Sequence, residues 1–307
     1  MPALSPRQVH VNVPLTNFSV QYDHLEYLTY RIAPAVDVKK EQDIYYVFNE
    51  NRESITPVNT ERAVGTPAAE VQLSGDTDTY QCKEYALAYK LPDRVRENAD
   101  DPWRLEQRGI GRTIDLLDLD KERRIQAMFQ TFGGAGQPPG ANVATKWDDT
   151  GGDPEGDIRA AKKIVRQAIG RVPNSMLISA DVGNALIGVI KSALTSLDLK
   201  TKLTFNDLPD MLWGLKLYIG NAIQNTANAG QTATIADVWN DNVVIFYMDP
   251  NPGLDGMNFV STFRSQKEMV IQWREDRIRS DMYEVNRVEV EKMVAPTAAY
   301  VLGDTLL

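Results

Sequence analysis

The chain has 307 residues, of which 43% are apolar and 24% are charged, and it carries 33 lysines and arginines against 42 aspartates and glutamates. This is the composition of an ordinary globular protein of about two domains. The net charge of -9 and the absence of any run of lysines and arginines argue against a protein that coats nucleic acid, because phosphate groups repel an acidic surface. No stretch approaches the roughly 18 consecutive apolar residues of a membrane-spanning helix, so we expect no membrane partner.

Cysteine and histidine are too scarce for several kinds of site. The single cysteine, Cys82, excludes an intramolecular disulfide and a cysteine-based zinc site. The two histidines, His10 and His24, both lie near the N-terminus, far along the sequence from every other polar cluster. A catalytic triad or a histidine-rich metal centre is therefore not expected.

Residues 1–36 are expected to form an extended arm. Several prolines interrupt this segment, and apolar residues alternate from Val9 to Val13. Proline blocks helix continuation, and alternating β-branched residues favour a strand. The arm has no apolar partner of its own, so we expect it to lie along another surface and to become ordered only in an assembly. A frayed terminus is the alternative.

Residues 37–90 are expected to form an extended loop with the shape of a two-stranded finger. The stretches that predict strands are Ile44–Phe48, Glu70–Leu73 and Tyr80–Tyr89. Long polar connections separate them, and an isolated hairpin is only marginally stable in water, so the finger should lie on a neighbouring subunit. The candidate subunit-interface residues are the charged side chains Arg52, Glu53, Glu61 and Arg62.

A long helix is predicted to begin at Asp101-Pro102, since aspartate is a good N-cap and proline is favoured in the first turn. Apolar residues then recur at helical spacing, which places Ile114 and Leu117 on the buried face. The helix should stop before the glycine-rich segment 133–140. About thirty residues would span roughly 45 Å, which is longer than most globular helices.

The rest of the chain predicts a compact mixed domain followed by two long strands. A second helix should run from Asp153-Pro154 to Gly170, and a third should follow the cap Ser179. The predicted strands are Met176–Ile178, Leu215–Ile219, Val243–Met248, Met269–Arg274 and Met282–Val294. The almost entirely apolar strand Val243–Met248 is expected at the centre of a sheet. Residues 208–213 are expected to form one or two helical turns, and residues 221–234 a polar loop.

No convergent catalytic motif emerges. The string Gly109-Ile110-Gly111 resembles half of a dinucleotide-binding fingerprint, but the third glycine and the preceding strand are missing. The acidic cluster at residues 148–157 has the oxygen ligands that Ca²⁺ prefers, although Arg159 stands where an EF-hand loop ends in glutamate. The competing interpretation of this cluster is a helix N-cap with favourable charges beside it. We therefore assign no catalytic, cofactor-binding or metal-binding residues, and we expect no enzymatic activity.

Several strings occur in an order that resembles one family. They are Tyr80–Leu87, Asn98–Asp100, Glu122–Arg124, Trp147–Asp149, Asp153–Ile158, Gly170–Ser179, and Ala236–Asp241 followed by Val243–Tyr247. Together with the order of arm, extended loop, long helix, mixed domain and closing strands, they resemble the major capsid proteins of tailed phages, the Hong Kong 97-type family. The resemblance runs from about Asp37 to Leu307.

The resemblance implies an α+β fold in four parts. These are an N-terminal arm (1–36), an extended β-hairpin loop (37–90), a peripheral domain with a long spine helix (91–150 and 262–307), and an axial domain (151–261). It also implies a structural subunit that assembles as pentamers and hexamers into an icosahedral head around double-stranded DNA, without sequence-specific binding. The implied partners are further copies of the chain, a separate scaffolding protein, a portal and decoration proteins, with assembly in the bacterial host cytoplasm and residence in the virion.

Some members of this family join a loop lysine to an asparagine of the peripheral domain by an isopeptide bond. The lysines of the loop region, Lys39, Lys40 and Lys83, match no such motif, so cross-linking is not expected. Two alternatives stay open. One is an encapsulin-type bacterial nanocompartment that encloses cargo enzymes, and the other, from a different class, is a metal- or nucleotide-dependent enzyme that uses the acidic cluster 148–157.

Overall fold

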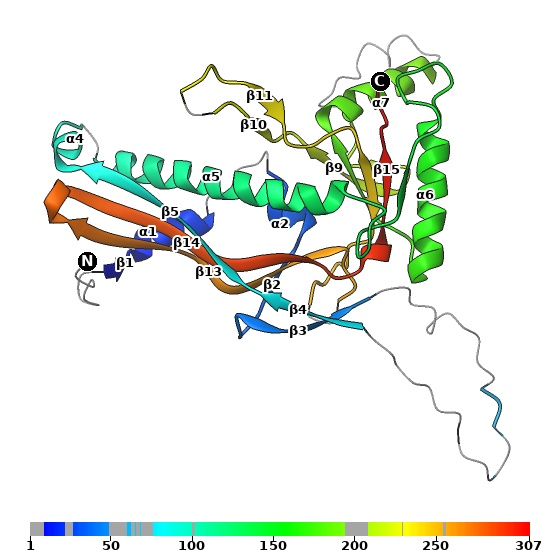
Figure 1. Cartoon of the computed structure of the whole chain (residues 1–307), viewed down its shortest axis with the longest axis horizontal. Coiled ribbons are helices and arrows are strands. Elements are labelled where there is room, and N and C mark those ends of the chain that lie inside the picture. The colour runs from blue at the N-terminus through cyan, green and yellow to red at the C-terminus, as the bar shows by residue number, and fades with distance from the viewer. Residues whose placement is uncertain are drawn as a thin grey trace.

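The structure is a computed structural model, and it describes residues 9–21, 27–48, 60–62, 65, 68, 76–99, 102–193, 208–228, 230–253 and 256–307. Two lobes share one long helix, α5 (Pro102–Gln130), and a narrow finger leaves the molecule near their junction (Figure 1). The long lobe is built on a five-stranded sheet and the compact lobe on a six-stranded sheet.

The long lobe consists of its sheet with α5 lying along it (Figure 1). The strand order is β1 (Val9–Val11), β13 (Val260–Glu275), β14 (Ser280–Met293) and β5 (Lys83–Pro92), with β2 (Ala35–Asp37) parallel to β13. Short helical segments complete the lobe: α1 (Val13–Gln21), α2 (Thr29–Ile32), α4 (Asp93–Glu97) and the turn η2 (Asp276–Ile278). The strands β13 and β14 form one long antiparallel hairpin, and α5 lies over β14 and its neighbour β5.

The compact lobe places helices on both faces of its sheet. The strand order is β6 (Gly140–Asn142), β15 (Ala299–Gly303), β12 (Val243–Phe246), β7 (Ser175–Ser179), β9 (Leu215–Gly220) and β8 (Met211–Leu212). The other elements are α6 (Pro154–Ile169), α7 (Ala180–Ala193) and the turn η3 (Pro296–Ala298). Met176 and Ile178 of β7 join the core beneath α6 and α7, whereas Leu177 points to the core that contains the end of α5. The strand β12 lies inside the sheet with every residue buried, which confirms its predicted central place.

Two antiparallel ribbons stand apart from these sheets. The finger is the ribbon of β3 (Gln42–Val47) and β4 (Asp76–Gln81), and the second ribbon joins β10 (Ile223–Asn225) to β11 (Ile235–Asp237). The strand β10 lies inside the polar loop that the sequence predicted at residues 221–234, and β11 begins directly after it. β8 replaces the predicted helical turns at residues 208–213.

Helix α5 contributes to a hydrophobic core in each lobe, and its buried charged residues Lys121 and Glu122 lie between the two apolar stretches. Near its start, Ile110 and Ile114 pack with Leu15 of α1 in the long lobe. Near its end, Phe129 is fully buried in the compact lobe and meets the rings of three aromatic residues edge to face. Those partners are Trp239, Phe246 and Phe259. The predicted helix and its predicted buried face are confirmed.

One of the two glycines near the start of α5, Gly109, has a packing role. Gly109 and Gly111 lie inside the helix and not in a strand-to-helix turn, so they do not build a dinucleotide site. A Cβ atom on Gly109 would lie only 2.2 Å from the ring of Tyr89 on β5. Glycine destabilises a helix, but at this position it allows α5 to lie in close contact with the sheet.

Part of the arm is helical and packs on its own chain, contrary to the extended arm that the sequence predicted. β1 pairs with β13, and α1 then brings Leu15 into the core with no exposed surface. The side chain of Asn12 accepts a hydrogen bond from the backbone N–H of Leu15 at 3.0 Å and caps the first turn. Pro14 lies in that first turn, where a missing N–H costs nothing, so it does not block this helix.

Two strands have boundaries that differ from the predictions, for distinct reasons. The predicted strand Met269–Arg274 is the far end of β13, because register shifts on both sides of Gln266 interrupt the alternation that would have revealed its first half. The predicted strand Tyr80–Tyr89 is divided at Cys82. Its first part pairs with β3 in the finger and its second part pairs with β14, so residues 83–90 lie in the sheet of the long lobe.

The substitution Ile114→Asp should lower the free energy of unfolding by about 3 to 5 kcal/mol, because it places an unpaired carboxylate among buried side chains of α1, α5 and the sheet. The matched control is Leu116→Asp, since Leu116 lies two residues further on the same helix with 46% of its surface exposed. Chemical denaturation of both variants measures the difference. Equal stability of the two variants would show that the assigned face of α5 is wrong.

Candidate assembly site

The finger has one face that packs on its own chain and one that does not. On the inner face, Tyr45 and Tyr80 are buried against Phe263 of β13, with ring centroids 5.2 and 4.7 Å apart respectively. On the outer face, Ile44 and Tyr46 are 62% and 56% exposed. A two-stranded ribbon with apolar residues on both faces can cover only one of them within the subunit.

Polar contacts fix the inner face of the finger. The hydroxyl of Tyr45 donates a hydrogen bond to Asp78 at 3.0 Å across the two strands of the ribbon. Asp78 also faces Lys292 of β14 at 3.5 Å, and the backbone N–H of Thr79, together with the Tyr45 hydroxyl, lowers the pKa of its carboxyl. These contacts hold the base of the finger to β13 and β14. The long lobe therefore sets the direction in which the finger points.

Close to this base, a buried ion cluster joins α5 to β14. The ammonium group of Lys121 lies 3.0 Å from a carboxylate oxygen of Glu289 and 3.8 Å from one of Glu291, and none of these side chains is more than 2% exposed. The ring of Tyr30 covers the ammonium at 3.3 Å, and the Tyr30 hydroxyl donates a hydrogen bond of 2.7 Å to Glu289. Polar and aromatic partners therefore occupy the positions around the ammonium group that water would otherwise fill.

Two arginines extend the cluster in opposite directions. Arg287 of β14, only 2% exposed, lies 2.8 Å from Asp118 of α5 and 3.7 Å from Glu268 of β13. Arg124 donates two hydrogen bonds to Glu291, at 3.0 and 3.1 Å. The cluster thus spans the helix and both strands of the long hairpin.

The protonation behaviour of the cluster follows from burial and from its mixture of charges. Burial lowers the pKa of Lys121 to about 8, although the two glutamates oppose this shift. Burial raises the pKa of Glu289, but Lys121 and Arg287 outweigh it and hold the pKa below its ordinary value. Glu268, which has weaker partners, keeps a pKa above its ordinary value because of its burial. The charged groups of the cluster are thus stabilised by one another and not by water.

Glu122, the next residue of α5, ties two further parts of the chain to the helix. Its carboxylate accepts hydrogen bonds from the backbone N–H groups of Leu28 and Thr29, at 2.9 and 3.0 Å, at the start of α2. It also accepts one from the indole N–H of Trp239 at 2.7 Å. Burial raises the pKa of this carboxyl, while the donors oppose the shift. One side chain therefore holds the arm and the compact lobe against α5.

The acidic cluster at residues 148–157 serves local structure. Asp153 caps α6 by accepting a hydrogen bond from the N–H of Gly156 at 3.0 Å, and Asp157 accepts one from the indole of Trp147 at 2.9 Å. Within the described ranges, no group of three or more histidine, cysteine, aspartate and glutamate side chains is placed to hold a metal ion. In the same part of the chain, no helix is both long enough and apolar enough to cross a membrane.

Comparison with known proteins gives matches over nearly the whole chain. No protein-family profile matches it. The major capsid protein of Burkholderia phage BcepMu is 26% identical over 249 residues, which are 78% of this chain and 76% of that protein. A solved phage-related protein from Bordetella bronchiseptica RB50 has a TM-score of 0.75 at 20% identity, over 97% of this chain and 98% of that one. The mature capsid of bacteriophage PhiM1 has a TM-score of 0.57 at 12% identity, over 92% of this chain and 87% of that one.

The chain has the fold of a tailed-phage capsid subunit. The family resemblance and the α+β Hong Kong 97-type fold class that the sequence predicted are confirmed. The relationship to a phage major capsid protein supports a structural role in a virus shell. For a capsid subunit, the functional site is the set of surfaces that meet neighbouring subunits, so the outer face of the finger and its supports are the candidate site.

Two of the four predicted interface residues lie in the part of the chain that the structure describes. Arg52 and Glu53 lie outside the described residues. Glu61 and Arg62 are described and exposed. Their role as subunit contacts stays a prediction, as does the division of the chain into four domains.

Sequence reasoning missed the apolar part of this candidate site. Ile44 and Tyr46 were assigned only to a strand, but the uninterrupted apolar string from Ile44 to Phe48 contains the missing signal. Such a string predicts burial on both faces, and a two-stranded ribbon needs a second surface for that. The ribbon of β10 and β11 shows the same feature, with Ile223 and Ile235 exposed by 56% and 61%.

The substitution Lys121→Met should lower the free energy of unfolding by about 3 to 5 kcal/mol, because two buried glutamates lose their shared cation. The double variant Lys121→Met with Glu289→Gln should recover part of this loss, since one of the uncompensated charges is then removed. Denaturant titration of the wild type, both single variants and the double variant gives the coupling energy. Additive losses in this cycle would contradict a direct ion pair.

Proposed function

We propose that this chain is the major capsid protein of a tailed phage and that it assembles as pentamers and hexamers into an icosahedral head around double-stranded DNA. The observation that carries the proposal is the relationship to a phage major capsid protein over 249 residues. The fold agrees, because its long lobe extends away from the compact lobe and offers a large surface to neighbours (Figure 1). Its role is to form contacts between subunits, and we propose no catalytic role.

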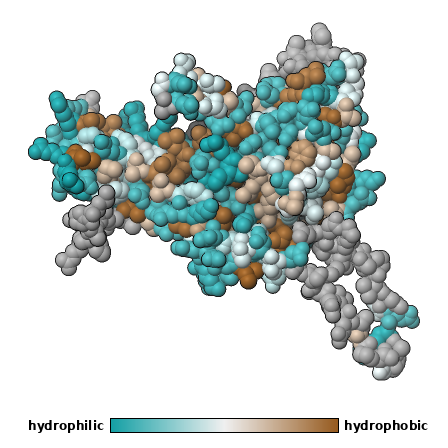
Figure 2. Space-filling model, in the orientation of Figure 1, coloured by the Kyte–Doolittle hydropathy of each residue, from teal (hydrophilic) through white to brown (hydrophobic). Residues whose placement is uncertain are grey.

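The surface of the subunit is compatible with such a role. Figure 2 shows apolar residues scattered among polar ones over the long and compact lobes. The described residues include several large apolar side chains that are at least half exposed, among them Ile44, Tyr46, Met211, Ile223 and Ile235. We propose that the outer face of the finger covers a surface of a neighbouring copy, and that charged residues such as Arg52 and Arg62 set its orientation there.

Other partners belong to this proposal. They are a separate scaffolding protein, a portal and decoration proteins, with assembly in the cytoplasm of a bacterial host and final residence in the virion. The acidic net charge of -9 fits a shell that holds DNA without binding it tightly over its whole inner surface.

Purified protein, alone or with a scaffolding protein, should form closed shells of uniform size in negative-stain electron microscopy. Particles recovered from infected or expressing cells should contain double-stranded DNA and no enzyme cargo. Shells filled with an enzyme would instead assign the chain to a nanocompartment. The absence of any closed particle under all assembly conditions would contradict the proposal.

The double substitution of Ile44→Ser and Tyr46→Ser should weaken assembly by about 2 kcal/mol for each contact, roughly thirtyfold in an association constant, because two apolar side chains no longer leave water. The melting temperature of the isolated subunit should change little, since both side chains are already exposed. Light scattering follows assembly against protein concentration. The matched control is Ile164→Ser with Val172→Ser, an exposed apolar pair of the compact lobe, which should assemble as the wild type does.

A further inference from the structure

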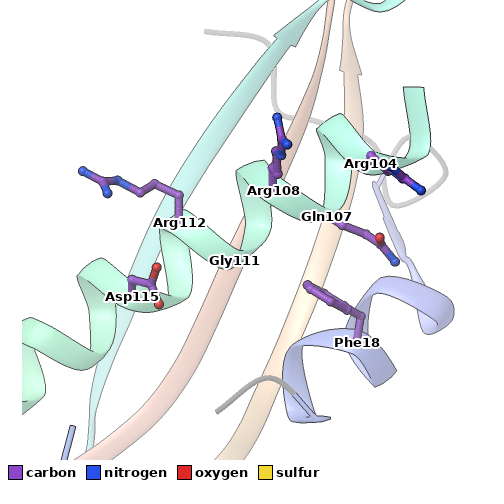
Figure 3. A pocket seen from close by; sticks show the side chains of 7 residues that line it. All are labelled: Phe18, Arg104, Gln107, Arg108, Gly111, Arg112 and Asp115. Carbon is purple, nitrogen blue, oxygen red and sulfur yellow. The ribbon is translucent and has the colours of Figure 1, made fainter. Parts of the chain in front are cut away.

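Helix α5 carries a row of arginines on its solvent face. Arg104, Arg108 and Arg112 are spaced four residues apart and all are exposed. Residues four apart lie on the same side of a helix, one turn above another. Figure 3 shows Arg108 and Arg112 projecting from α5 away from α1. We call these three residues the arginine row.

The arginine row borders a surface groove between α5 and α1. The groove has a volume of about 470 Å³ and is also lined by Phe18, Gln107 and Asp115. In Figure 3, the ring of Phe18 points from α1 towards α5, and Gln107 lies on the same side of the helix. The groove is therefore apolar where Phe18 lies, and the helix face that carries Arg108 and Arg112 adjoins it.

Among the described residues, two acidic side chains of α5 near the arginine row pair with other arginines. Glu106 is buried and pairs with Arg96 at 3.3 Å. Asp120 pairs with Arg124 one turn further along α5. Asp115 is the acidic residue that shares the groove. Positive charge thus gathers on this face of a chain whose net charge is -9.

The sequence hides this feature because the basic residues are not consecutive. A search for runs of lysine and arginine finds none, whereas the helix brings every fourth residue together. The acidic net charge therefore does not exclude contact with nucleic acid at this face, since a basic patch can act within a Debye length of about 8 to 10 Å.

We propose that the arginine row contacts the phosphate backbone of double-stranded DNA. Successive arginines are separated by about 6 Å along the helix axis, from a rise of 1.5 Å per residue. A DNA strand offers one phosphate for about every 3.4 Å of duplex axis, so the guanidinium groups of Arg108 and Arg112 can each meet a different phosphate. Guanidinium groups bind phosphate oxygens in a bidentate manner, and contacts to phosphates carry no sequence information.

This inference rests on the proposed function, because it takes the packaged genome as the polyanion. It differs from that function in naming the surface that meets DNA. An acidic segment of a neighbouring subunit or of a scaffolding protein is the competing occupant, and the experiment below separates the two.

The test measures binding of a short random-sequence DNA duplex to full-length unassembled subunits by fluorescence anisotropy, over a range of salt concentrations. The variant is Arg108→Gln with Arg112→Gln. The matched control is Lys163→Gln with Arg166→Gln, an exposed basic pair of α6. Wild type and control should bind with a logarithmic salt slope of about -0.9 for each phosphate contacted, and the variant should lose about two contacts from that slope.

Each outcome decides the proposal. A smaller salt slope in the α5 variant alone, with unchanged melting temperature, supports it. Absence of DNA binding by the wild type at low salt, or equal loss in the variant and the control, overturns it. A variant that binds DNA normally but no longer assembles would assign the arginine row to a protein contact and also overturn it. Assembly is recorded by electron microscopy on the same preparations, and failure of the wild type to form shells counts against the proposed function and not against the DNA contact.

Discussion

The ammonium group of Lys121 lies between Glu289 and Glu291 without access to water, and the arrangement of both lobes depends on this buried ion pair. A lysine in such a place is tolerated only while its partners stay close, because an unpaired buried charge is very costly. A shift of α5 by one turn, about 5.4 Å, would separate them, so the cluster sets the register of helix on sheet. The neighbouring Glu122 then holds the start of α2 and Trp239, which links the arm and the compact lobe to the same turn of helix.

Much of the fold follows from local signals in the sequence. The start of α5 at Pro102, the start of α6 at Pro154 and the apolar strand β12 are all encoded by caps and by hydrophobic pattern. The helix α1 was missed because Pro14 counts against a helix unless it falls in the first turn. The first half of β13 was missed because its bulges disrupt alternation. In the first case, the segment before the helix pairs with residues more than 250 positions away. In the second case, the strand contains an irregularity that no repeating pattern describes.

The candidate site is less visible in the sequence than the fold. Charged residues in the finger were readily found, but the burial of Lys121 depends on Glu289, 168 residues later in the chain. Nothing within a few residues of Lys121 distinguishes it from a lysine on a solvated helix face. The arginine row was missed for the opposite reason, since its residues are close in the sequence but form a patch only after the helix is built. Long-range pairing and helical geometry are the two kinds of information that a linear search lacks.

The division of one continuous stretch at Cys82 has a mechanical meaning. The strand before this residue belongs to the finger and the strand after it belongs to the long lobe, so the backbone angle at Cys82 couples the direction of the finger to the plane of the lobe. Cys82 itself contacts the carbonyl of Phe263, and Tyr45 and Tyr80 pack on the ring of the same residue, so the base of the finger cannot rotate here without breaking contacts with the long lobe. A force on the finger is therefore transmitted to β13 and β14 and is not absorbed by a hinge.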